Sequence, residues 1–470
     1  MKKLSSEPPA QPIVAFVGID WADQKHDIVW SAATSAAATE HQVVANRPEA
    51  LSQWVTEMRQ RFGPHGRIAI FLEQSRGALI HHLMNYEGLV LYPINPLQMA
   101  HYRKAIKVSG DKHDRLDATL LCQFGRLHLD GLKPWQPDDA LTRKLALLNE
   151  DRRQAIEKRS ALANELKSAL KIYYPLALEL LDNDTSTLLA ADLVLHWPTL
   201  EVLQKQSQSK LRRFFYAHNC RSEQKMLQRL ELIQQAQPMI RDSAIIEAAA
   251  LKVQLLTQQL KSLLPYIALY EKQIAQLFDS HPDGFLFSDL PGAGPALGPR
   301  LLTAFGSNRD RFGSSTEAAT TFGIAPIRDS SGKRTPKQPG TVCYRHACPK
   351  FLRQSWHEFA ACSIRSCPWA DAYYDAQRAK GKSHHTAVRA LAFKWIRIAY
   401  ACWKIAPLTL PTATSLPSPN AVHASPLPPL NNCQKIPRFL LTDLLRRLRV
   451  AKPHRRFCFP KFHPIVQCSA

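Results

Sequence analysis

Two short apolar segments near the N-terminus each end in a carboxylate, and this pattern limits the possible folds of the chain more than any other feature. Residues 13–20 (IVAFVGID) end in Asp20, and residues 67–73 (RIAIFLE) end in Glu73. Short apolar runs of this length are typical of buried strands. Because adjacent strands of one sheet bring their ends together, we expect both acids at one edge of a sheet.

The segments around these two runs predict an α/β fold for residues 13–135. Three strands precede the first helix, and strands alternate with helices after it. The predicted strands are residues 13–20, 27–33, 40–46, 67–73 and 88–95, and the predicted helices are residues 47–62, 75–86, 96–106 and 114–128. This order indicates a mixed sheet with helices packed on it. Asp23 and Asp27 then belong to a hairpin and a strand edge.

A second pair of acids follows in the segment KHDRLDA. Asp114 and Asp117 are three residues apart and share one face of the predicted helix. Four carboxylates at one point repel one another unless cations neutralise them, and Mg²⁺ (or Mn²⁺) prefers such oxygen ligands. The pattern therefore predicts a metal site at Asp20, Glu73, Asp114 and Asp117, where two ions about 4 Å apart can clamp a phosphodiester. The alternative for each acid alone is a helix cap or a solvated strand end.

Residues 140–280 are predicted to be almost entirely helical. Their long segments lack glycine and repeat apolar residues every three to four positions. Leu251, Leu255, Leu263 and Ile267 are candidates for a coiled-coil seam, which Pro265 would interrupt. A packed helical domain and a dimerising coil remain alternatives for this region.

The positive charge of the chain is concentrated in its C-terminal part. Residues 281–470 hold 27 lysines and arginines against nine acidic residues, so they carry +18 of the net +22. Such asymmetry points to a polyanion, most often nucleic acid. Residues 285–404 form a third predicted unit, and residues 405–470 are a proline-rich basic tail that we expect to be disordered.

The compartment predicted from the sequence is the cytoplasm. The N-terminal segment has no apolar region of a secretory signal, and no apolar run is long enough to cross a membrane. The ten cysteines include no C-x-x-C pair, which favours free thiols in a reducing environment.

Three motifs together resemble a known family. The segments VGIDWADQKHDIV, FLEQSRG and KHDRLDA resemble the RuvC-like branch of the ribonuclease H fold and, more narrowly, the DEDD transposases of the insertion-sequence one-ten family. The family usually has threonine or asparagine where this chain has His113. The segment LPGAGPALGPRLLTAFG is similar to the C-terminal transposase domain of the same family, a mostly helical domain with a helix-hairpin-helix-type element. The resemblance covers about residues 13–404.

The resemblance implies a function and several site residues. It implies a bacterial, nucleoid-associated enzyme that cleaves and rejoins DNA with bound Mg²⁺, guided by an RNA from its own element and acting as a dimer or tetramer. It assigns the nucleophile to Ser331 in RDSSGKR, with Ser330 as the lesser candidate. The residues expected to contact the nucleic-acid backbone are Gly292, Gly294, Gly298, Arg300, Arg328, Lys333 and Arg334.

Other functions are weighed against this one. A RuvC-like nuclease would use metal-activated water and need no serine. A sugar kinase or actin-like ATPase shares the first motif, but no second phosphate motif, adenosine motif or GxxxxGK[ST] loop follows it. A basic scaffold without activity would leave the four carboxylates unexplained. A solvated helix face explains Arg76, Arg103, Lys104 and Lys107 as well as contact with a nucleic-acid strand does.

Overall fold

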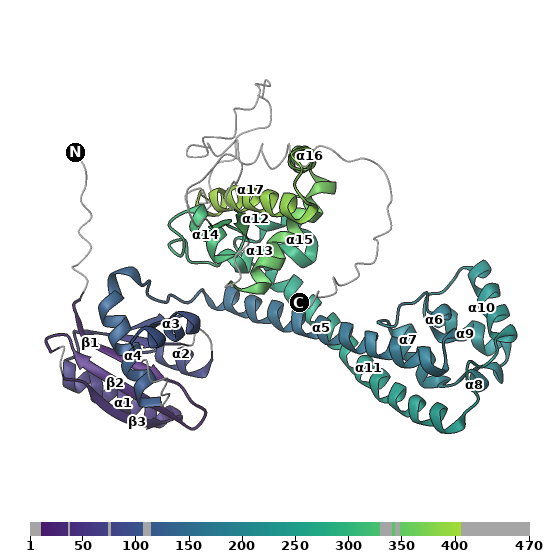
Figure 1. The fold of residues 1–470 in the computed structure, drawn as a ribbon, viewed down its shortest axis with the longest axis horizontal. Helices are drawn as coiled ribbons and strands as arrows, with labels where there is room; N and C mark the ends of the chain where they lie inside the picture. The colour runs from purple at the N-terminus through teal and green to yellow at the C-terminus, as the bar shows by residue number, and fades with distance from the viewer. Residues whose placement is uncertain are drawn as a thin grey trace, which may run out of the picture. The chain divides into compact units, whose positions relative to one another are not determined.

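The structure is a computed structural model, and it describes residues 11–35, 38–73, 77–106, 114–329, 341–343 and 348–405. The chain divides into two compact units, with the boundary between Pro137 and Asp138. Figure 1 labels the helices and strands of both units. The domain limits expected at residues 280 and 285 fall inside the second unit and stay predictions.

The first unit contains a five-stranded mixed sheet, as the strand pattern predicts. Its strands are β1 (Ile13–Asp20), β2 (Lys25–Ala32), β3 (Glu40–Ala45), β4 (Arg67–Leu72) and β5 (Leu89–Pro93). They lie in the order β3-β2-β1-β4-β5, with β1, β4 and β5 parallel and β2 antiparallel to both of its neighbours. The carboxyl ends of β1 and β4 therefore lie at the same edge of the sheet, and Glu73 follows β4 directly.

Helices cover both faces of this sheet. They are α1 (Pro48–Phe62), α2 (Ala78–Leu83), α3 (Pro96–Ile106) and α4 (Asp114–His128). Val17 and Ile19 pack in one core with residues of α1 and α2, whereas Phe16 packs in a second core with residues of α3 and α4. Since side chains alternate along a strand, Asp20 shares the α4 face with Phe16.

Small residues bring α4 unusually close to the sheet. A Cβ atom on Gly18 of β1 would lie 2.1 Å from the Ala118 carbonyl oxygen, and one on Gly125 would lie 2.3 Å from the Phe71 ring. The Cys122 thiol donates to the Phe16 carbonyl at 3.2 Å, which ties the same helix to β1. The first turn of α4, with Asp114 and Asp117, is consequently held near the end of β1.

Two long helices form the axis of the second unit. They are α5 (Ala140–Tyr173) and α11 (Ser243–Asp279), which lie side by side (Figure 1). Arg152 near the start of α5 pairs with Glu271 near the end of α11 at 2.5 Å, so the two helices run antiparallel. The helix α11 continues through Pro265, and the interruption of a coiled-coil seam at this residue stays a prediction.

The predicted seam of α11 is not buried as a whole within one chain, and its role in a dimerising coil stays a prediction. Ile267 is buried, but Leu251 and Leu255 are 70% and 56% exposed. The helix instead buries a neighbouring stripe that includes Val253, Leu256 and Leu260. The choice of face depends on α5 and α7, which contact α11, and a heptad pattern carries no information about those partners.

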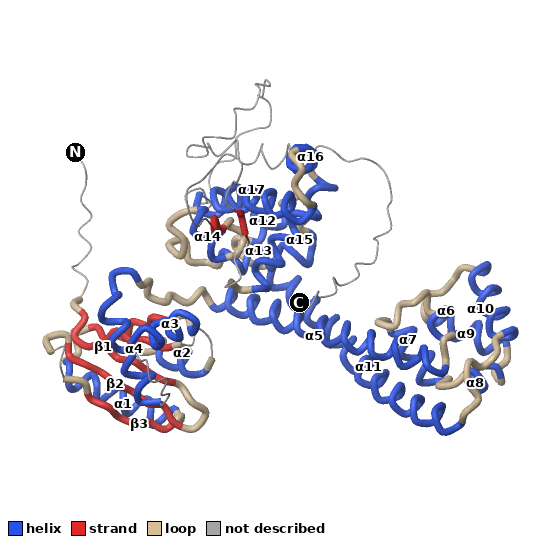
Figure 2. Tube along the Cα trace, viewed as in Figure 1, coloured by secondary structure: helices blue, strands red, loops and turns tan. Residues whose placement is uncertain are grey.

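The remaining helices of the second unit form two groups. One group packs around the core of Leu166, Leu193, Phe215 and Leu230; it comprises α6 (Leu176–Leu180), α7 (Leu188–His196), α8 (Leu200–Gln204), α9 (Gln208–Ala217) and α10 (Glu223–Gln235). The other comprises α12 (Gly284–Ser288), α13 (Gly294–Phe305), α14 (Ser315–Thr321), α15 (Lys350–Ser366), α16 (Pro368–Ala379) and α17 (His384–Ile405). Figure 2 shows that helices dominate this unit, with the short strands β6 (Ile327–Asp329) and β7 (Thr341–Cys343) beside them.

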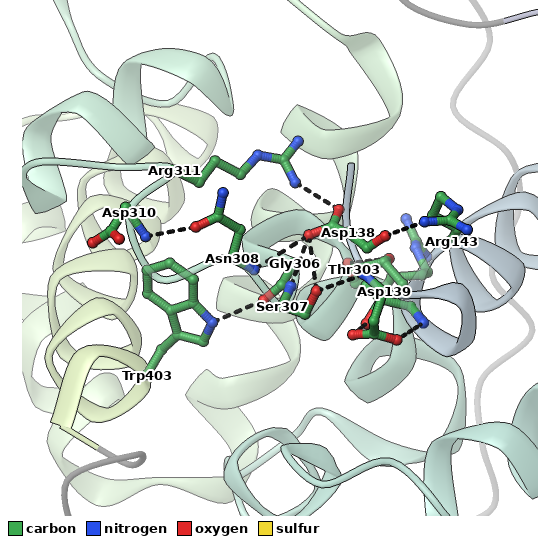
Figure 3. A network of polar contacts seen from close by, with 12 residues as sticks. Asp138, Asp139, Arg143, Thr303, Gly306, Ser307, Asn308, Asp310, Arg311 and Trp403 are labelled. Carbon is green, nitrogen blue, oxygen red and sulfur yellow. Dashed lines mark hydrogen bonds and ion pairs between the residues drawn. The ribbon is translucent and has the colours of Figure 1, made fainter. Parts of the chain in front are cut away.

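The first residue of the second unit is held by a network of polar contacts (Figure 3). One carboxylate oxygen of Asp138 accepts from the backbone N–H groups of Ser307 at 2.8 Å and Asn308 at 3.4 Å. The other accepts from the Arg311 guanidinium at 3.1 Å. The Trp403 indole donates to the Gly306 carbonyl at 2.9 Å, which ties this loop to α17. Asp138 thereby anchors the beginning of α5 to the C-terminal helices.

Within the described ranges, none of the helices combines the length and apolarity that crossing a lipid bilayer requires. The predicted tail, residues 405–470, lies outside the described residues apart from Ile405.

The close approach of α4 predicts the effect of adding one methyl group. Gly18→Ala should lower the free energy of unfolding by roughly 2–3 kcal/mol, because the new Cβ overlaps the α4 backbone. Gly131→Ala is the matched control, since a Cβ there meets nothing within 4 Å, and it should change stability by less than about 0.5 kcal/mol. Urea unfolding of the full chain, followed by circular dichroism, measures both. Equal stability of the two variants would contradict the packing described.

Candidate active site

The fold brings the four predicted acids to one edge of the sheet. Asp20 is the last residue of β1 and is partly buried, and Glu73, also partly buried, follows the last residue of β4. Asp114 begins α4 and is exposed, whereas Asp117 in the same turn is 5% exposed. Acidic residues in the first turn also suit the positive end of the helix dipole.

The electrostatics of Asp20 shows that these acids act on one another. Burial raises the pKa of Asp20 to about 7, with further contributions from the negative charges of Asp117, Asp114, Glu73 and Asp27, in that order. A carboxyl group in ordinary surroundings has a pKa near 4. Like charges crowded in a partly buried place favour the neutral form. The site therefore has an unmet need for positive charge at neutral pH.

Asp27 is a member of this group that the sequence interpretation missed. It lies directly opposite Asp20 in the β1–β2 pair and is 6% exposed. Its carboxylate is 2.6 Å from Nε2 of His41 on β3. The interpretation of Asp27 as an edge residue without a role is therefore incomplete. The short turn of residues 21–24 predicts a hairpin, but the sequence does not give its register. The pairing of Asp20 with Asp27 therefore comes from the structure.

Arg103 of α3 reaches the group. The Nη2 atom of Arg103 is 2.7 Å from Oδ1 of Asp117, and the two side chains are 23% and 7% exposed. The pairing places Arg103 inside the site, so the solvated-face interpretation does not hold for this residue. Lys104 next to it is exposed, and Arg76 and Lys107 lie outside the described residues.

The site offers carboxylate oxygens, which are the donor atoms that a hard divalent cation prefers. In the part of the chain that the structure describes, no three histidine, cysteine, aspartate or glutamate side chains are close enough to hold one metal ion. The four predicted acids offer carboxylate oxygens, and burial together with the negative charges of neighbouring acids raises the pKa of Asp20. All-oxygen ligands with excess negative charge are the chemistry that Mg²⁺ or Mn²⁺ requires.

The three glycines predicted to contact nucleic acid differ in their surroundings. A Cβ on Gly292 would lie 2.8 Å from the Ser366 hydroxyl, and one on Gly298 would lie 2.9 Å from the Phe278 ring, so packing alone requires both. Gly294, with φ of +57°, faces open space. It begins α13, whose exposed first turn has no side-chain cap. Gly294 is therefore the glycine whose surroundings fit an approaching phosphate.

Arg300 is engaged within the second unit. Its Nη1 donates to Glu358 at 2.7 Å and its Nε donates to the Ser355 hydroxyl at 2.9 Å, while the guanidinium lies over the Phe351 ring. The side chain is 11% exposed. These contacts give Arg300 a packing role, and its contact with nucleic acid stays a prediction.

The predicted nucleophile and its neighbours lie outside the described residues. These are Ser330, Ser331, Lys333 and Arg334; for Arg328 the structure describes the backbone, in β6, but not the side chain. Their roles stay predictions.

Comparison with known proteins identifies related sequences. The family model DEDD_Tnp_IS110, described as a transposase, matches residues 17–175, and the model described as "Transposase IS116/IS110/IS902 family" matches residues 285–375. The chain is 26% identical over 397 residues to the "Mini-circle putative transposase for IS117" of Streptomyces coelicolor, covering 83% of this chain and 94% of the relative. It is 25% identical over 401 residues to an uncharacterized 42 kDa protein of insertion element IS900 from Mycobacterium paratuberculosis, covering 83% and 96%. The first matched range includes all four predicted acids.

The raised pKa of Asp20 predicts how stability changes with pH in metal-free buffer. Below about pH 4 the carboxyl is protonated in both states, so the folded state keeps its full stability there. As the pH rises toward 7, the unfolded chain loses this proton first, and stability falls until the folded pKa is passed. Asp20→Asn removes the charge, so we expect it to be more stable than the wild type by about 2 kcal/mol near pH 8, allowing for solvent screening.

Near pH 4 the two proteins should be almost equally stable, because an uncharged Asp20 resembles asparagine. Thermal unfolding of both proteins between about pH 4 and pH 8 with a chelator present provides the measurement. A difference that does not change with pH would contradict the assignment of this charge to Asp20.

Proposed function

The chain belongs to the IS110 family of DEDD transposases, and from this premise we propose that it cuts and rejoins DNA by metal-dependent strand transfer through a phosphoserine intermediate, guided by an RNA of its own element. The carboxylate site would hold the metal, and Ser331 would be the nucleophile. The observation that carries the proposal is the grouping of acidic side chains around the partly buried Asp20, which together with burial raises its pKa to about 7.

The four acids share one task in this proposal. Asp20, Glu73, Asp114 and Asp117 would hold Mg²⁺ or Mn²⁺, which when bound supplies charge stabilisation for the phosphodiester under attack. Asp20 must lose its proton to become a ligand, and its pKa of about 7 makes this loss easy near neutral pH. The close packing of α4 on Gly18 supports the proposal, since it fixes Asp114 and Asp117 beside Asp20.

The covalent step is a transfer of the phosphodiester to serine. The Ser331 oxygen would form a bond to phosphorus as its proton leaves, and the bond from phosphorus to one deoxyribose oxygen would break, releasing an alcohol once that oxygen takes up a proton. A second DNA end would then displace the serine by the reverse of this step. Arg328, Lys333 and Arg334 flank Ser331 in sequence and would attract the phosphate.

Nucleic-acid partners are supported by charge and by one backbone feature. Residues 281–470 carry most of the net positive charge of the chain, which suits both DNA and a structured RNA. The exposed, uncapped first turn of α13 at Gly294 offers backbone N–H groups to a phosphate. Contacts of this kind hold a strand without reading its sequence.

Strand transfer between DNA ends also suggests more than one copy of the chain. Leu251, Leu255 and Leu269 are exposed along α11. We infer that this apolar stripe contacts a second copy, so that the protein is a dimer or tetramer.

Replacement of Ser331 tests the covalent step. Ser331→Ala should abolish the covalent protein–DNA adduct on a labelled element-end duplex with the element's RNA and Mg²⁺, because no hydroxyl remains to bond phosphorus. Ser330→Ala is the matched control and should retain the adduct. Denaturing electrophoresis resolves adduct from free DNA.

The same assay separates transposase from nuclease chemistry. Asp20→Asn should abolish adduct formation and all strand cleavage, because the metal site loses a ligand. If Ser331→Ala still cleaves the duplex at the wild-type rate while Asp20→Asn does not, water is the nucleophile and the phosphoserine step is wrong.

The oligomer is tested by charge on the apolar stripe. The double variant Leu251→Glu with Leu255→Glu should lower the molar mass measured by light scattering, because two buried charges would face each other across the contact. Leu127→Glu is the matched control: Leu127 is 70% exposed, as Leu251 is, but lies on α4 of the first unit. An unchanged mass in the double variant would contradict this interface.

A further inference from the structure

The ion pair between Arg103 and Asp117 links α3 to the most buried acid of the carboxylate site. Asp117 makes the largest contribution of any charge to the raised pKa of Asp20. It is also the acid with the least solvent around it, at 5% exposed. The guanidinium of Arg103 thus contacts the most buried of the four acids.

The contact is close in distance but poorly directed. The Nη2 and Oδ1 atoms are 2.7 Å apart, yet Oδ1 of Asp117 has no hydrogen-bond partner of suitable angle in the described structure. The Nε atom of Arg103 is buried there without a partner as well. Arginine normally meets a carboxylate with two parallel hydrogen bonds. This pair therefore has charge attraction without the directional bonds that would fix it in place.

The surroundings make a purely structural pair a poor explanation. The Arg103 side chain is partly exposed, but its Nε–H is buried without a partner, which is costly to the folded state. Charge attraction to Asp117 and its acidic neighbours offsets this cost as long as no other cation neutralises them.

We propose that Arg103 is an internal counter-ion of the carboxylate site, which releases Asp117 when a divalent cation binds. This inference rests on the proposed function, because it takes the four acids to be metal ligands. The guanidinium and the metal compete for the same carboxylate oxygen. Arg103 therefore weakens metal binding while it stabilises the metal-free protein.

Metal affinity measured without any reaction tests the competition. Titration of the full chain with Mn²⁺ by calorimetry should show that Arg103→Gln binds the ion about tenfold more tightly than the wild type, since the competitor is gone. Lys104→Gln is the matched control; it removes an exposed charge from the same turn of α3 and should change affinity by less than about twofold. Arg103→Lys keeps a positive charge but lacks the forked guanidinium. Its Mn²⁺ affinity should therefore lie between those of the wild type and Arg103→Gln.

Thermal unfolding gives an independent readout of the same competition. Without metal, Arg103→Gln should melt at a lower temperature than the wild type, and saturating Mn²⁺ should raise its melting temperature by more. The larger rise with Mn²⁺ also demonstrates that the variant is folded. If Arg103→Gln binds Mn²⁺ no more tightly than Lys104→Gln, or more weakly than the wild type, Arg103 orients the site and does not compete.

The results of these experiments distinguish a failure of this inference from a failure of the proposed function on which it rests. Wild-type protein that binds no Mn²⁺, or binds it as well after Asp20→Asn, overturns the proposed metal site and the inference with it. Wild-type binding that is lost in Asp20→Asn supports the metal site. Only the comparison of Arg103→Gln with Lys104→Gln then decides the role of Arg103.

Discussion

The mutual repulsion of acidic side chains at the end of β1 is the constraint on which the first unit depends. The sheet and α4 would pack comfortably with neutral residues at Asp20 and Asp117, yet the fold holds them together through contacts that need glycine at position 18. Side chains from two other elements contact these acids, with the Arg103 guanidinium at Asp117 and the His41 ring at Asp27. Stability and charge thus oppose each other here, a combination that is frequent at functional sites.

Much of this arrangement follows from simple sequence patterns. The apolar runs ending in Asp20 and Glu73 predicted two strands correctly, and the parallel pairing of β1 with β4 places both ends at one edge. Asp27 escaped prediction because the sequence does not state the hairpin register, and a shift of one residue moves a side chain to the other face. Arg103 could not be assigned either, since a basic residue in a helix gives no sign of whether it meets solvent or an acid on another helix.

The helical unit shows where charge and periodicity mislead. The basic composition of the C-terminal part predicts binding of nucleic acid, but it does not say which cations are available for it. Arg300 forms an ion pair with Glu358, and Arg309 forms one with Asp283, both inside the second unit. The periodicity of α11 likewise predicted a helix but not its buried face, because α5 and α7 determine that choice. In both cases the missing information lies in partners distant in sequence.

The anchoring of Asp138 has a mechanical consequence. The N–H of Trp135 donates to the Leu91 carbonyl at 2.7 Å, and the Trp135 ring packs on the core of the first unit. Asp138 is fixed in the second unit by Ser307 and Arg311. Only Gln136 and Pro137 lie between these two anchors. The Cα atoms of Trp135 and Asp138 can therefore be at most about 11 Å apart. Proline fixes its own φ at position 137 and disfavours helical backbone at Gln136, so α5 cannot extend backward through this joint as a continuous helix.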